Sequence, residues 1–407
     1  MEARTKKPGR IPELDGLRVL MIFIVSWFHI WQQSWLEPRV DIPALGIRTS
    51  LDFLVRTGYV WVDGTVLLSA FLLYLPLARQ GREPLRDIPG FYRRKARRIL
   101  PGYWFVILLI FFAICLPWNM YGANGPFLVK DLFTHFTMTF TFFRDTYLYS
   151  PLGGAFWTAA IVTQGYLLFP LLSRGMHRHP ARTAVCMALG AWAFRAWCLW
   201  GLTEYPMVVN ALPNFLDVYA LGFTCALLYA ELEKTENGPG AKAAFLREDR
   251  FRHARSAAAT LVFFGCLIAL CELLKVQAHN IDYPALQGHQ MIYRPLFALG
   301  FAGMILSAPF SVKPLRALLG NRVTAFLAAI SMNYYLTHQT LAVHLKRLRI
   351  PYSLSDTPNM VGEQPWQIHY TLLAFGLSLV LAAAITYLVE KPVRRLLEKR
   401  EAQKNKG

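Results

Sequence analysis

Charged residues are scarce in this sequence, and acidic residues are the scarcest of them. Only 17% of the 407 residues are Asp, Glu, Lys or Arg, whereas 55% are hydrophobic. A soluble domain carries about 25% charged residues. This shortage argues against a set of soluble domains, because so many apolar side chains need a lipid bilayer around them.

Cysteine is also rare, with six residues at positions 115, 186, 198, 225, 266 and 271, all within apolar runs. Their spacing fits no metal site, so we interpret them as small packing residues. His177 and His179 lie in a basic loop without a neighbouring carboxylate or cysteine. The sequence therefore predicts no metal site and no permanently bound cofactor.

The sequence lacks low-complexity tracts, Ser/Gly linkers and a small-residue cleavage site after its first apolar run. That run is therefore expected to remain as the first helix. A membrane-spanning helix needs about 20 mostly apolar residues. Ten candidates lie near residues 14–35, 57–79, 99–117, 154–173, 183–203, 210–231, 257–276, 292–311, 323–344 and 368–389. The more polar stretch 128–146 is expected to be interfacial or re-entrant.

The basic residues set the orientation of these helices. With the N-terminus inside, the inside segments contain about 31 of the 43 Lys and Arg residues and the outside segments about eight. The inside segments are then 1–13, 79–98, 174–182, 232–256, 312–322 and 391–407. The basic residues are spread between apolar runs rather than gathered on a soluble domain, so we expect no nucleic-acid partner.

The predicted fold is an all-α polytopic membrane bundle of about ten transmembrane helices with both termini cytoplasmic. Its predicted parts are a cytoplasmic tail at 1–13, a transmembrane domain at 14–390 and a basic cytoplasmic tail at 391–407. The pattern predicts no oligomeric state.

The first apolar run contains two ionisable residues, Arg18 and His29, eleven positions apart. In a helix this spacing rotates the side chains by only about 20° and separates them by about 16 Å along the axis. Arg18 is then expected at the cytoplasmic boundary and His29 at mid-membrane, where ionisable groups usually face a bundle interior or a wet cavity. The pair suits a phosphate-bearing donor held by arginine and a hydroxyl deprotonated by histidine. A snorkelling arginine and a histidine bonded to a neighbouring helix would give the same pattern.

A basic run lies directly on the cytoplasmic side of the third expected span. Five of the six residues from Arg93 to Arg98 are Lys or Arg. The run either anchors the topology against anionic lipid or holds the phosphates of a nucleotide-bearing donor. The two roles are compatible.

The ninth expected span is unusually polar. Ser331, Tyr334, Tyr335 and His338 share one face of it. This face predicts either hydrogen bonds between helices or the lining of a cavity. Glu390 ends the last span and is expected to pair with an arginine on the cytoplasmic side.

These motifs, in this order, resemble the acyltransferase 3 family of membrane acyltransferases over essentially the whole chain. The matching segments are Ile11 to Arg18 with His29 following, Val62-Asp63, Leu68 to Phe71 with Ala70 where glycine is usual, Arg94 and Arg97, Asn333 to Gln339, and Val389 to Pro392. Each motif alone is weak, but their order and spacing over ten helices are specific.

The resemblance implies transfer of an acyl group, commonly acetyl, from cytoplasmic acyl-coenzyme A to a hydroxyl of an envelope carbohydrate. Acyl-coenzyme A would be a co-substrate, the carbohydrate the acceptor, and the cytoplasmic membrane the location. Whether the catalytic histidine acts as a base or transiently carries the acyl group is left open.

The resemblance also implies roles for individual residues. His29 would be catalytic, and the donor would be held by Arg18, Arg94, Arg97 and Arg98. Counted back from Ile99-Leu100-Pro101, the basic pair of the family would instead be Lys95 and Arg98. Tyr334, His338, Gln164 and Asp63 are expected to line the cavity, and Asp15 and Glu390 to form structural ion pairs.

One segment departs from the family pattern. Phe156 to Pro170 is similar to a block with a glutamate in its middle, where this chain has Val162, and Gly165 replaces an aromatic residue. A carboxylate could orient a histidine or accept a proton, whereas valine can do neither. Either another group substitutes, or activity is reduced, or the role differs.

The rival functions are a transporter or exporter of an acyl group or glycan precursor, and a catalytically silent family member that scaffolds an envelope complex.

Overall fold

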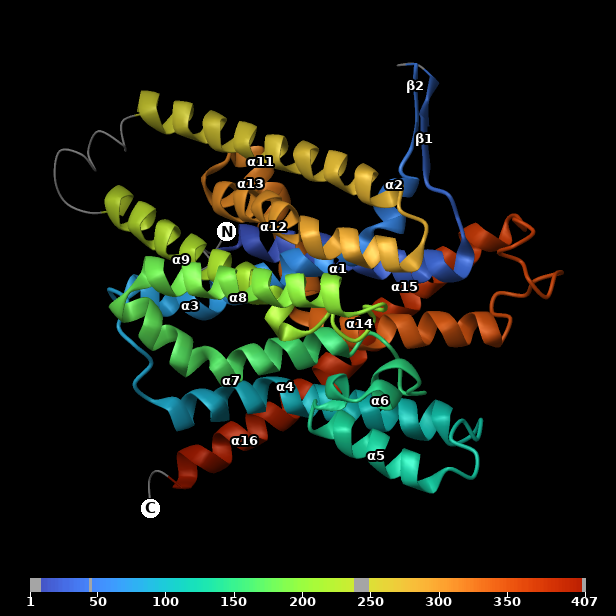
Figure 1. The fold of residues 1–407 in the computed structure, drawn as a ribbon. Helices are drawn as coiled ribbons and strands as arrows, with labels where there is room; N and C mark the ends of the chain where they lie inside the picture. The colour runs from blue at the N-terminus through green and yellow to red at the C-terminus, as the bar shows by residue number, and fades with distance from the viewer. Residues whose placement is uncertain (1–8, 44–45, 238–248, 405–407) are drawn as a thin grey trace. The chain divides into compact units, whose positions relative to one another are not determined.

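The computed structural model describes residues 9–43, 46–237 and 249–404, and long helices dominate it (Figure 1). The α-helices are α1 (Glu13–Ser34), α2 (Asp52–Arg56), α3 (Trp61–Arg79), α4 (Ile88–Ile110), α5 (Gly125–Phe136), α6 (Arg144–Leu148), α7 (Trp157–Arg178), α8 (Pro180–Gly201), α9 (Leu216–Asn237), α11 (Asp249–Ala278), α12 (Tyr283–Ser307), α13 (Lys313–Leu319), α14 (Arg322–Arg347), α15 (Trp366–Ala384) and α16 (Lys391–Lys404). The predicted all-α class is confirmed.

Shorter elements complete the described chain. Two π-helical segments, η3 (Phe111–Cys115) and η7 (Ile385–Glu390), continue α4 and α15. The 3-10 turns are η2 (Gly58–Val60), η4 (Phe140–Phe142), η5 (Leu212–Phe215) and η6 (Ala308–Phe310). Strands β1 (Arg39–Ile42) and β2 (Ile47–Ser50) form a small antiparallel hairpin with Arg39 opposite Ser50.

Eight helical segments within the described ranges are long and apolar enough to cross a membrane. They correspond to the expected spans at α1, α3, α4, α8, α9, α11, α12 and α15. The two other expected spans, α7 and α14, are helices of 22 and 26 residues with more polar sequences. The polytopic architecture is thus established, while the total of ten spans and the cytoplasmic termini stay predictions. The stretch 128–146 folds into α5, η4 and α6, which are all short.

The chain divides into two compact units. Unit 1 comprises the described residues of Met1–Ile22, Val60–Leu85 and Leu167–Ala328. Unit 2 comprises those of Phe23–Tyr59, Arg86–Tyr166 and Ala329–Gly407. Helix α1 contributes its first half to unit 1 and its second half to unit 2.

Close helix packing builds unit 1. Helix α9 approaches α3 at Gly222, where an added Cβ would lie only 2.7 Å from the Cβ of Ala70. Gly64 of α3 faces α12 in the same way, because its Cβ would lie 2.7 Å from the ring of Phe301. Helices α11 and α12 also pack against each other and run side by side (Figure 1). Small residues at helix crossings are typical of membrane bundles.

Unit 2 is built around α4, α14 and α15. A buried cluster joins Tyr103 and Val106 of α4 to Phe156 and to Leu336 of α14. Gly102 lets α4 approach α14, since a Cβ there would lie 2.8 Å from the Asn333 side-chain oxygen.

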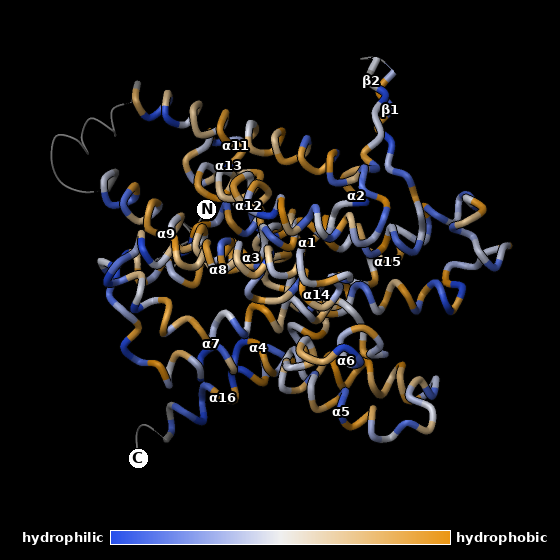
Figure 2. Tube along the Cα trace, in the orientation of Figure 1, coloured by the Kyte–Doolittle hydropathy of each residue, from blue (hydrophilic) through white to orange (hydrophobic). Residues whose placement is uncertain are grey.

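Three boundaries differ from the expected ones. The basic run from Arg93 forms the first turns of α4 rather than a loop, because Asp87 caps the helix start and Lys and Arg are good helix formers. Within the expected tail at 391–407, residues Lys391–Lys404 form helix α16, which is mainly hydrophilic (Figure 2), and 405–407 lie outside the described ranges. Of the expected inside loop 232–256, residues up to 237 belong to α9 and those from 249 to α11, and 238–248 lie outside the described ranges.

Candidate functional site

Two histidines from distant parts of the sequence meet in unit 2. The ring centroids of His29 on α1 and His338 on α14 lie 5.3 Å apart, with the planes tilted by 48°. His338 is fully buried, whereas His29 is partly exposed. The sequence predicted a reactive group at His29 and a cavity-lining role for His338, and the fold brings the two together.

Hydrogen bonds define which nitrogen of His338 is basic. Its Nδ1 donates to the backbone carbonyls of Tyr334 and Tyr335, at 3.2 and 2.8 Å. A neutral imidazole that donates from Nδ1 carries its lone pair on Nε2. That buried Nε2 has no hydrogen-bond partner among the described residues, so it is a buried proton acceptor.

His29 is oriented by its own helix. Its Nδ1 lies 3.0 Å from the amide oxygen of Gln32, one turn further along α1. The ring of Phe28 packs against the imidazole with centroids 4.9 Å apart. Donation from Nδ1 to this amide oxygen again leaves the lone pair on Nε2.

Tyr334 of α14 contacts the second half of α1. Its hydroxyl lies 2.6 Å from the Ser26 hydroxyl, and its ring stacks on Phe23 with centroids 5.0 Å apart. The ring also stacks on His338, with centroids 5.8 Å apart. Tyr334, predicted to line a cavity, is therefore buried between α1 and the imidazole of His338.

Helix α7 contacts α14 next to His338, through a residue one turn before Val162. The hydroxyl of Thr158 lies 2.6 Å from that of Tyr335, whose ring centroid is 5.6 Å from that of His338. Val162 follows four residues later on α7, with its apolar side chain partly exposed. The sequence thus places no carboxylate at this point of the helix.

Gln164 and Asp63 were both expected to line the cavity, and that role stays a prediction. The side-chain amide of Gln164 donates to the Thr141 hydroxyl at 3.2 Å, which connects α7 to η4. Asp63 belongs to unit 1, where it pairs with Arg294.

The arginines of α4 that were expected to bind the donor stand near the start of that helix. Asp87 accepts the backbone N–H of Gly90 at 2.8 Å and the guanidinium of Arg94 at 3.0 Å. These two contacts hold the pKa of Asp87 below its ordinary value, the backbone bond contributing most. Arg97 pairs with Glu401 of α16. Arg98 is exposed and has no carboxylate partner among the described residues.

Arg18 and His29 both lie within the single helix α1, as their spacing predicted. Arg18 is partly buried. The helix is unbroken between the two residues, so the expected axial separation of about 16 Å applies.

The two expected structural ion pairs have different outcomes. Asp15 pairs with Arg10 just before α1. The carboxylate of Glu390, at the end of η7, instead accepts the side-chain amide of Asn333 at 2.7 Å. An arginine partner for Glu390 is not found within the described ranges, because Asn333 occupies the adjacent face of α14.

A buried polar cluster on α5 was not predicted. Asp131 accepts hydrogen bonds from the hydroxyls of Tyr121 and Ser150, both at 2.7 Å. His135 places its Nδ1 3.0 Å from the Asp131 carboxylate, and its ring stacks on Phe140 with centroids 4.1 Å apart. Both Asp131 and His135 are fully buried. Their spacing of four residues was the available signal, since it places both on one helix face.

Unit 1 contains a buried network of charges that the sequence pattern also did not show. Arg294 donates to Asp63 at 3.2 Å and to the carbonyl of Val209 at 2.9 Å. Arg195 makes two hydrogen bonds to Asp217, at 2.7 and 2.8 Å. Both guanidinium groups are fully buried. Charges at this depth persist only when they are paired, so these pairs hold α3, α8, α9 and α12 in register.

No group of three or more His, Cys, Asp or Glu side chains that could hold a metal ion lies in the described ranges.

Comparison with known proteins identifies one family. No curated protein and no solved structure matches this chain. The acyltransferase 3 family model, described as an acyltransferase domain, matches residues 11–387. This match covers nearly the whole chain, including α1 with Arg18 and His29, α4, and α14 with His338. The protein therefore belongs to the acyltransferase 3 family and is a multi-pass membrane protein with an acyltransferase domain.

Proposed function

We propose that this protein is an O-acyltransferase of the cytoplasmic membrane that moves an acyl group, most simply acetyl, from acyl-coenzyme A to a hydroxyl of an envelope carbohydrate. Membership of the acyltransferase 3 family supports acyl transfer. The observation that carries the proposal is the pair of imidazoles in unit 2, with ring centroids 5.3 Å apart.

The imidazole of His29 suits the proton transfer that this reaction needs. The acceptor hydroxyl donates its proton to Nε2 of His29 while its oxygen attacks the thioester carbonyl carbon. The carbon–sulfur bond then breaks, and the imidazolium returns the proton to the departing thiolate. In the alternative route the same Nε2 attacks the thioester carbonyl first, the carbon–sulfur bond breaks and coenzyme A leaves as the thiolate. The acceptor hydroxyl then attacks the acyl-imidazole, which frees His29, and its proton goes to the thiolate. Both routes need the ring orientation that Gln32 and Phe28 provide.

The donor is proposed to enter from the cytoplasm. Coenzyme A carries phosphates, and arginine binds phosphate through paired N–H groups. Arg98 presents an exposed guanidinium on α4, and Arg18 lies on the same helix as His29. The excess of basic residues in the expected inside segments supports this orientation.

Replacement of His29 tests the proposal. Purified full-length protein with His29→Ala is expected to lose acyl transfer from acetyl-coenzyme A, and cells producing it to lose the corresponding esters on envelope carbohydrates by mass spectrometry. His279→Ala is a matched control, because His279 is exposed at the end of α11 and bonds a backbone carbonyl. Normal acylation by the His29 variant would refute the catalytic assignment.

Val162 favours a second candidate function, that of a catalytically silent family member acting as an envelope scaffold. The contact between Thr158 and Tyr335 is present. One turn later, however, this chain has Val162 where the family pattern has a glutamate. A purified wild-type protein that is inert towards acetyl-coenzyme A and several acceptor sugars, yet needed for envelope assembly, would support this function instead.

A further inference from the structure

The proposed acyl transfer needs one group that the two histidines do not supply. When an oxygen or a nitrogen adds to the thioester carbonyl carbon, the electrons of the carbonyl double bond move to the carbonyl oxygen, which becomes an oxyanion. Enzymes stabilise such an oxyanion with hydrogen-bond donors that are already in place, and removal of one donor typically lowers kcat by about 100-fold or more. A donor is therefore expected close to His29, on an element that holds it still.

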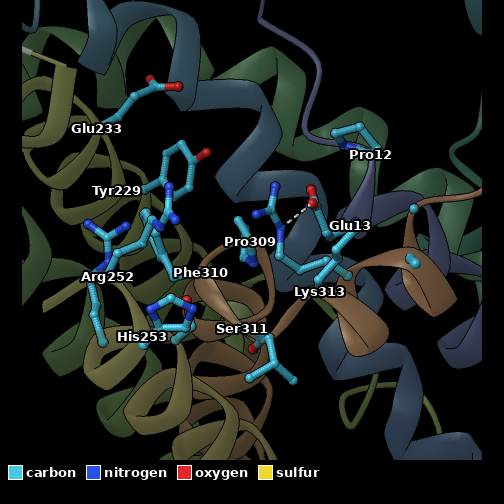
Figure 3. Close-up of a pocket in the computed structure, with 16 residues that line it drawn as sticks. Pro12, Glu13, Tyr229, Glu233, Arg252, His253, Pro309, Phe310, Ser311 and Lys313 are labelled. Atoms are coloured by element: carbon cyan, nitrogen blue, oxygen red, sulfur yellow. Dashed lines mark hydrogen bonds and ion pairs between the residues drawn. The ribbon is translucent and has the colours of Figure 1, made fainter. Parts of the chain in front are cut away.

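The cavity of about 940 Å³ in unit 1 does not supply this donor. Figure 3 shows Arg252 on one side of this cavity and Glu13 and Lys313 on the other. Every described residue that lines it belongs to unit 1, whereas the two histidines of the candidate site belong to unit 2. The donor is therefore expected on a helix of unit 2.

Two buried hydroxyl groups lie beside the histidines in unit 2. The Ser26 hydroxyl on α1 and the Tyr334 hydroxyl on α14 lie 2.6 Å apart, and both side chains are fully buried. Each hydroxyl carries one proton, but the hydrogen bond between them uses only one of the two protons. Among the described residues neither hydroxyl has a second hydrogen-bond partner. The pair therefore keeps one buried O–H group that can donate to a ligand.

The spare proton is expected on Ser26. A phenol is more acidic than an aliphatic alcohol and is the stronger donor, whereas the alcohol oxygen is the better acceptor, so Tyr334 donates to Ser26 Oγ. Buried hydroxyls in other helices of this protein, such as those of Ser307 and Thr337, donate to a carbonyl of their own helix. Within the described ranges Ser26 makes no such bond, so its O–H group is not used by α1.

Ser26 stands one turn before His29 on α1. Side chains three residues apart on a helix are neighbours, with about 5–6 Å between their Cβ atoms. This separation suits a carbonyl carbon that is attacked next to Nε2 of His29 while its oxygen is directed at Ser26. The hydroxyl pair of Thr158 and Tyr335 also lies beside His338, but Thr158 belongs to α7 rather than to the helix of His29.

We propose that Ser26 is the oxyanion donor of the acyl transfer and that Tyr334 positions it, an assignment that rests on the proposed function. As the acceptor oxygen, or Nε2 of His29, bonds to the carbonyl carbon, the Ser26 O–H group donates a hydrogen bond to the carbonyl oxygen, which gains negative charge. When the carbonyl double bond re-forms, the carbon–sulfur bond breaks and the thiolate leaves. Ser26 keeps its proton throughout, and the proton of the acceptor hydroxyl ends on the thiolate.

Steady-state kinetics of full-length variants purified in detergent test this role, with acetyl-coenzyme A as donor and carbohydrate extracted from the envelope of the producing cells as acceptor. Ser26→Ala removes the proposed donor. Tyr334→Phe keeps the ring stacks on Phe23 and His338 and the Ser26 hydroxyl, but removes the bond that orients this hydroxyl. We expect Ser26→Ala to lower kcat about 100-fold with little change in KM, and Tyr334→Phe to lower it only about fivefold, the factor of one neutral hydrogen bond.

Ser307→Ala is the matched control, because it removes a buried helical serine hydroxyl in unit 1 that bonds its own helix. Its kcat should equal that of wild type. Ser26→Thr keeps a hydroxyl at position 26 and should retain most of the kcat. Should Ser26→Ala fail to fold, Ser26→Cys replaces the hydroxyl by a weak donor and should still lower kcat more than Tyr334→Phe does.

A purely structural role of the hydroxyl pair predicts a different result. Ser26→Ala and Tyr334→Phe break the same hydrogen bond, so both would then lower the unfolding temperature and kcat to the same extent. Equal kcat values for these two variants, or a Ser26→Ala variant as active as wild type, would overturn the proposal. Wild-type protein that transfers no acetyl group would instead contradict the proposed function, and the assignment of Ser26 with it.

Discussion

His29 and His338 face each other across α1 and α14, with imidazole centroids 5.3 Å apart. Each ring has its Nδ1 engaged, by Gln32 for His29 and by two backbone carbonyls for His338. The two Nε2 atoms are thus left as the basic nitrogens. The Nε2 lone pair of His338 can therefore stabilise the charge that His29 gains when it accepts a proton.

The first prediction separates the two nitrogens of His338. In His338→Asn the amide N–H can still donate to the carbonyls as Nδ1 does, but nothing replaces Nε2. In His338→Gln the amide reaches the place of Nε2 and gives up the Nδ1 contact. If Nε2 assists catalysis, His338→Asn should lower kcat by about 100-fold, with His338→Gln retaining more activity.

Thermal unfolding of both His338 variants in detergent provides the control. A merely structural role predicts the reverse order, because His338→Asn preserves the bonds of Nδ1 and should be the more stable and more active protein. Separate measurement of kcat and KM for each purified variant decides between these outcomes.

The second prediction concerns the arginines of α4 that are proposed to bind the donor. Arg97 is held by Glu401, whereas Arg98 is exposed. We expect Arg98→Ala to raise the KM for acetyl-coenzyme A about tenfold with little change in kcat, because one phosphate contact of a charged group contributes roughly 1.5 kcal/mol. Steady-state kinetics with varied donor measure this effect.

Arg322→Ala is a suitable control for Arg98→Ala, since Arg322 is also exposed but stands at the start of α14. Unchanged donor KM in the Arg98 variant would contradict this assignment. A raised donor KM in Lys95→Ala alone would place the donor contact at Lys95, the other member of that pair. Lys95 lies over the Tyr166 ring, 4.3 Å from its centre.

Sequence patterns predict the features that depend only on residues close together in the chain. The spacing of Arg18 and His29 placed both on one helix, because helical periodicity needs no tertiary information. The contact of His29 with His338 was not predictable from spacing, since more than 300 residues separate them. The partners of Glu390 and Asp63 were likewise set by which helices pack together. The start of α4 was missed because Asp87 was not recognised as its cap.

The third prediction tests the unpredicted cluster on α5. Asp131→Asn replaces a buried carboxylate that accepts two hydroxyl bonds, and each bond to a charged group is worth about 1.5–3 kcal/mol. We expect a clear fall in the thermal unfolding temperature, with acyl transfer per folded molecule retained. Circular dichroism on heating measures the first quantity, and a transfer assay at low temperature the second.

Asp145→Asn is the matched control for Asp131→Asn, because Asp145 is partly exposed and pairs with Lys130 at 2.6 Å. Its pKa is lowered, mainly by that hydrogen bond. Because the pKa of Asp145 is lower in the folded protein than in the unfolded chain, its ion pair stabilises the fold at pH values above the pKa of the unfolded chain. This stabilisation is lost as the pH falls through the pKa of the folded protein. An Asp131 variant as stable as the Asp145 variant at neutral pH would contradict a supporting role for the cluster.

The last prediction concerns Val162, four residues beyond Thr158 on α7. Four residues turn a helix by about 40° past a full turn, so position 162 faces α14 in nearly the same direction as Thr158, which contacts Tyr335. A carboxylate there would stabilise an imidazolium on α1 or α14. We expect Val162→Glu to raise kcat about tenfold, less than the roughly 100-fold or more of a full general acid–base group because the carboxylate only assists a histidine. We also expect a lower unfolding temperature, because the charge is partly buried. Val162→Gln introduces a side chain of the same size as glutamate but without its charge, and it should not raise kcat. Equal rates for the Glu and Gln variants would show that a carboxylate at position 162 does not assist the imidazole pair.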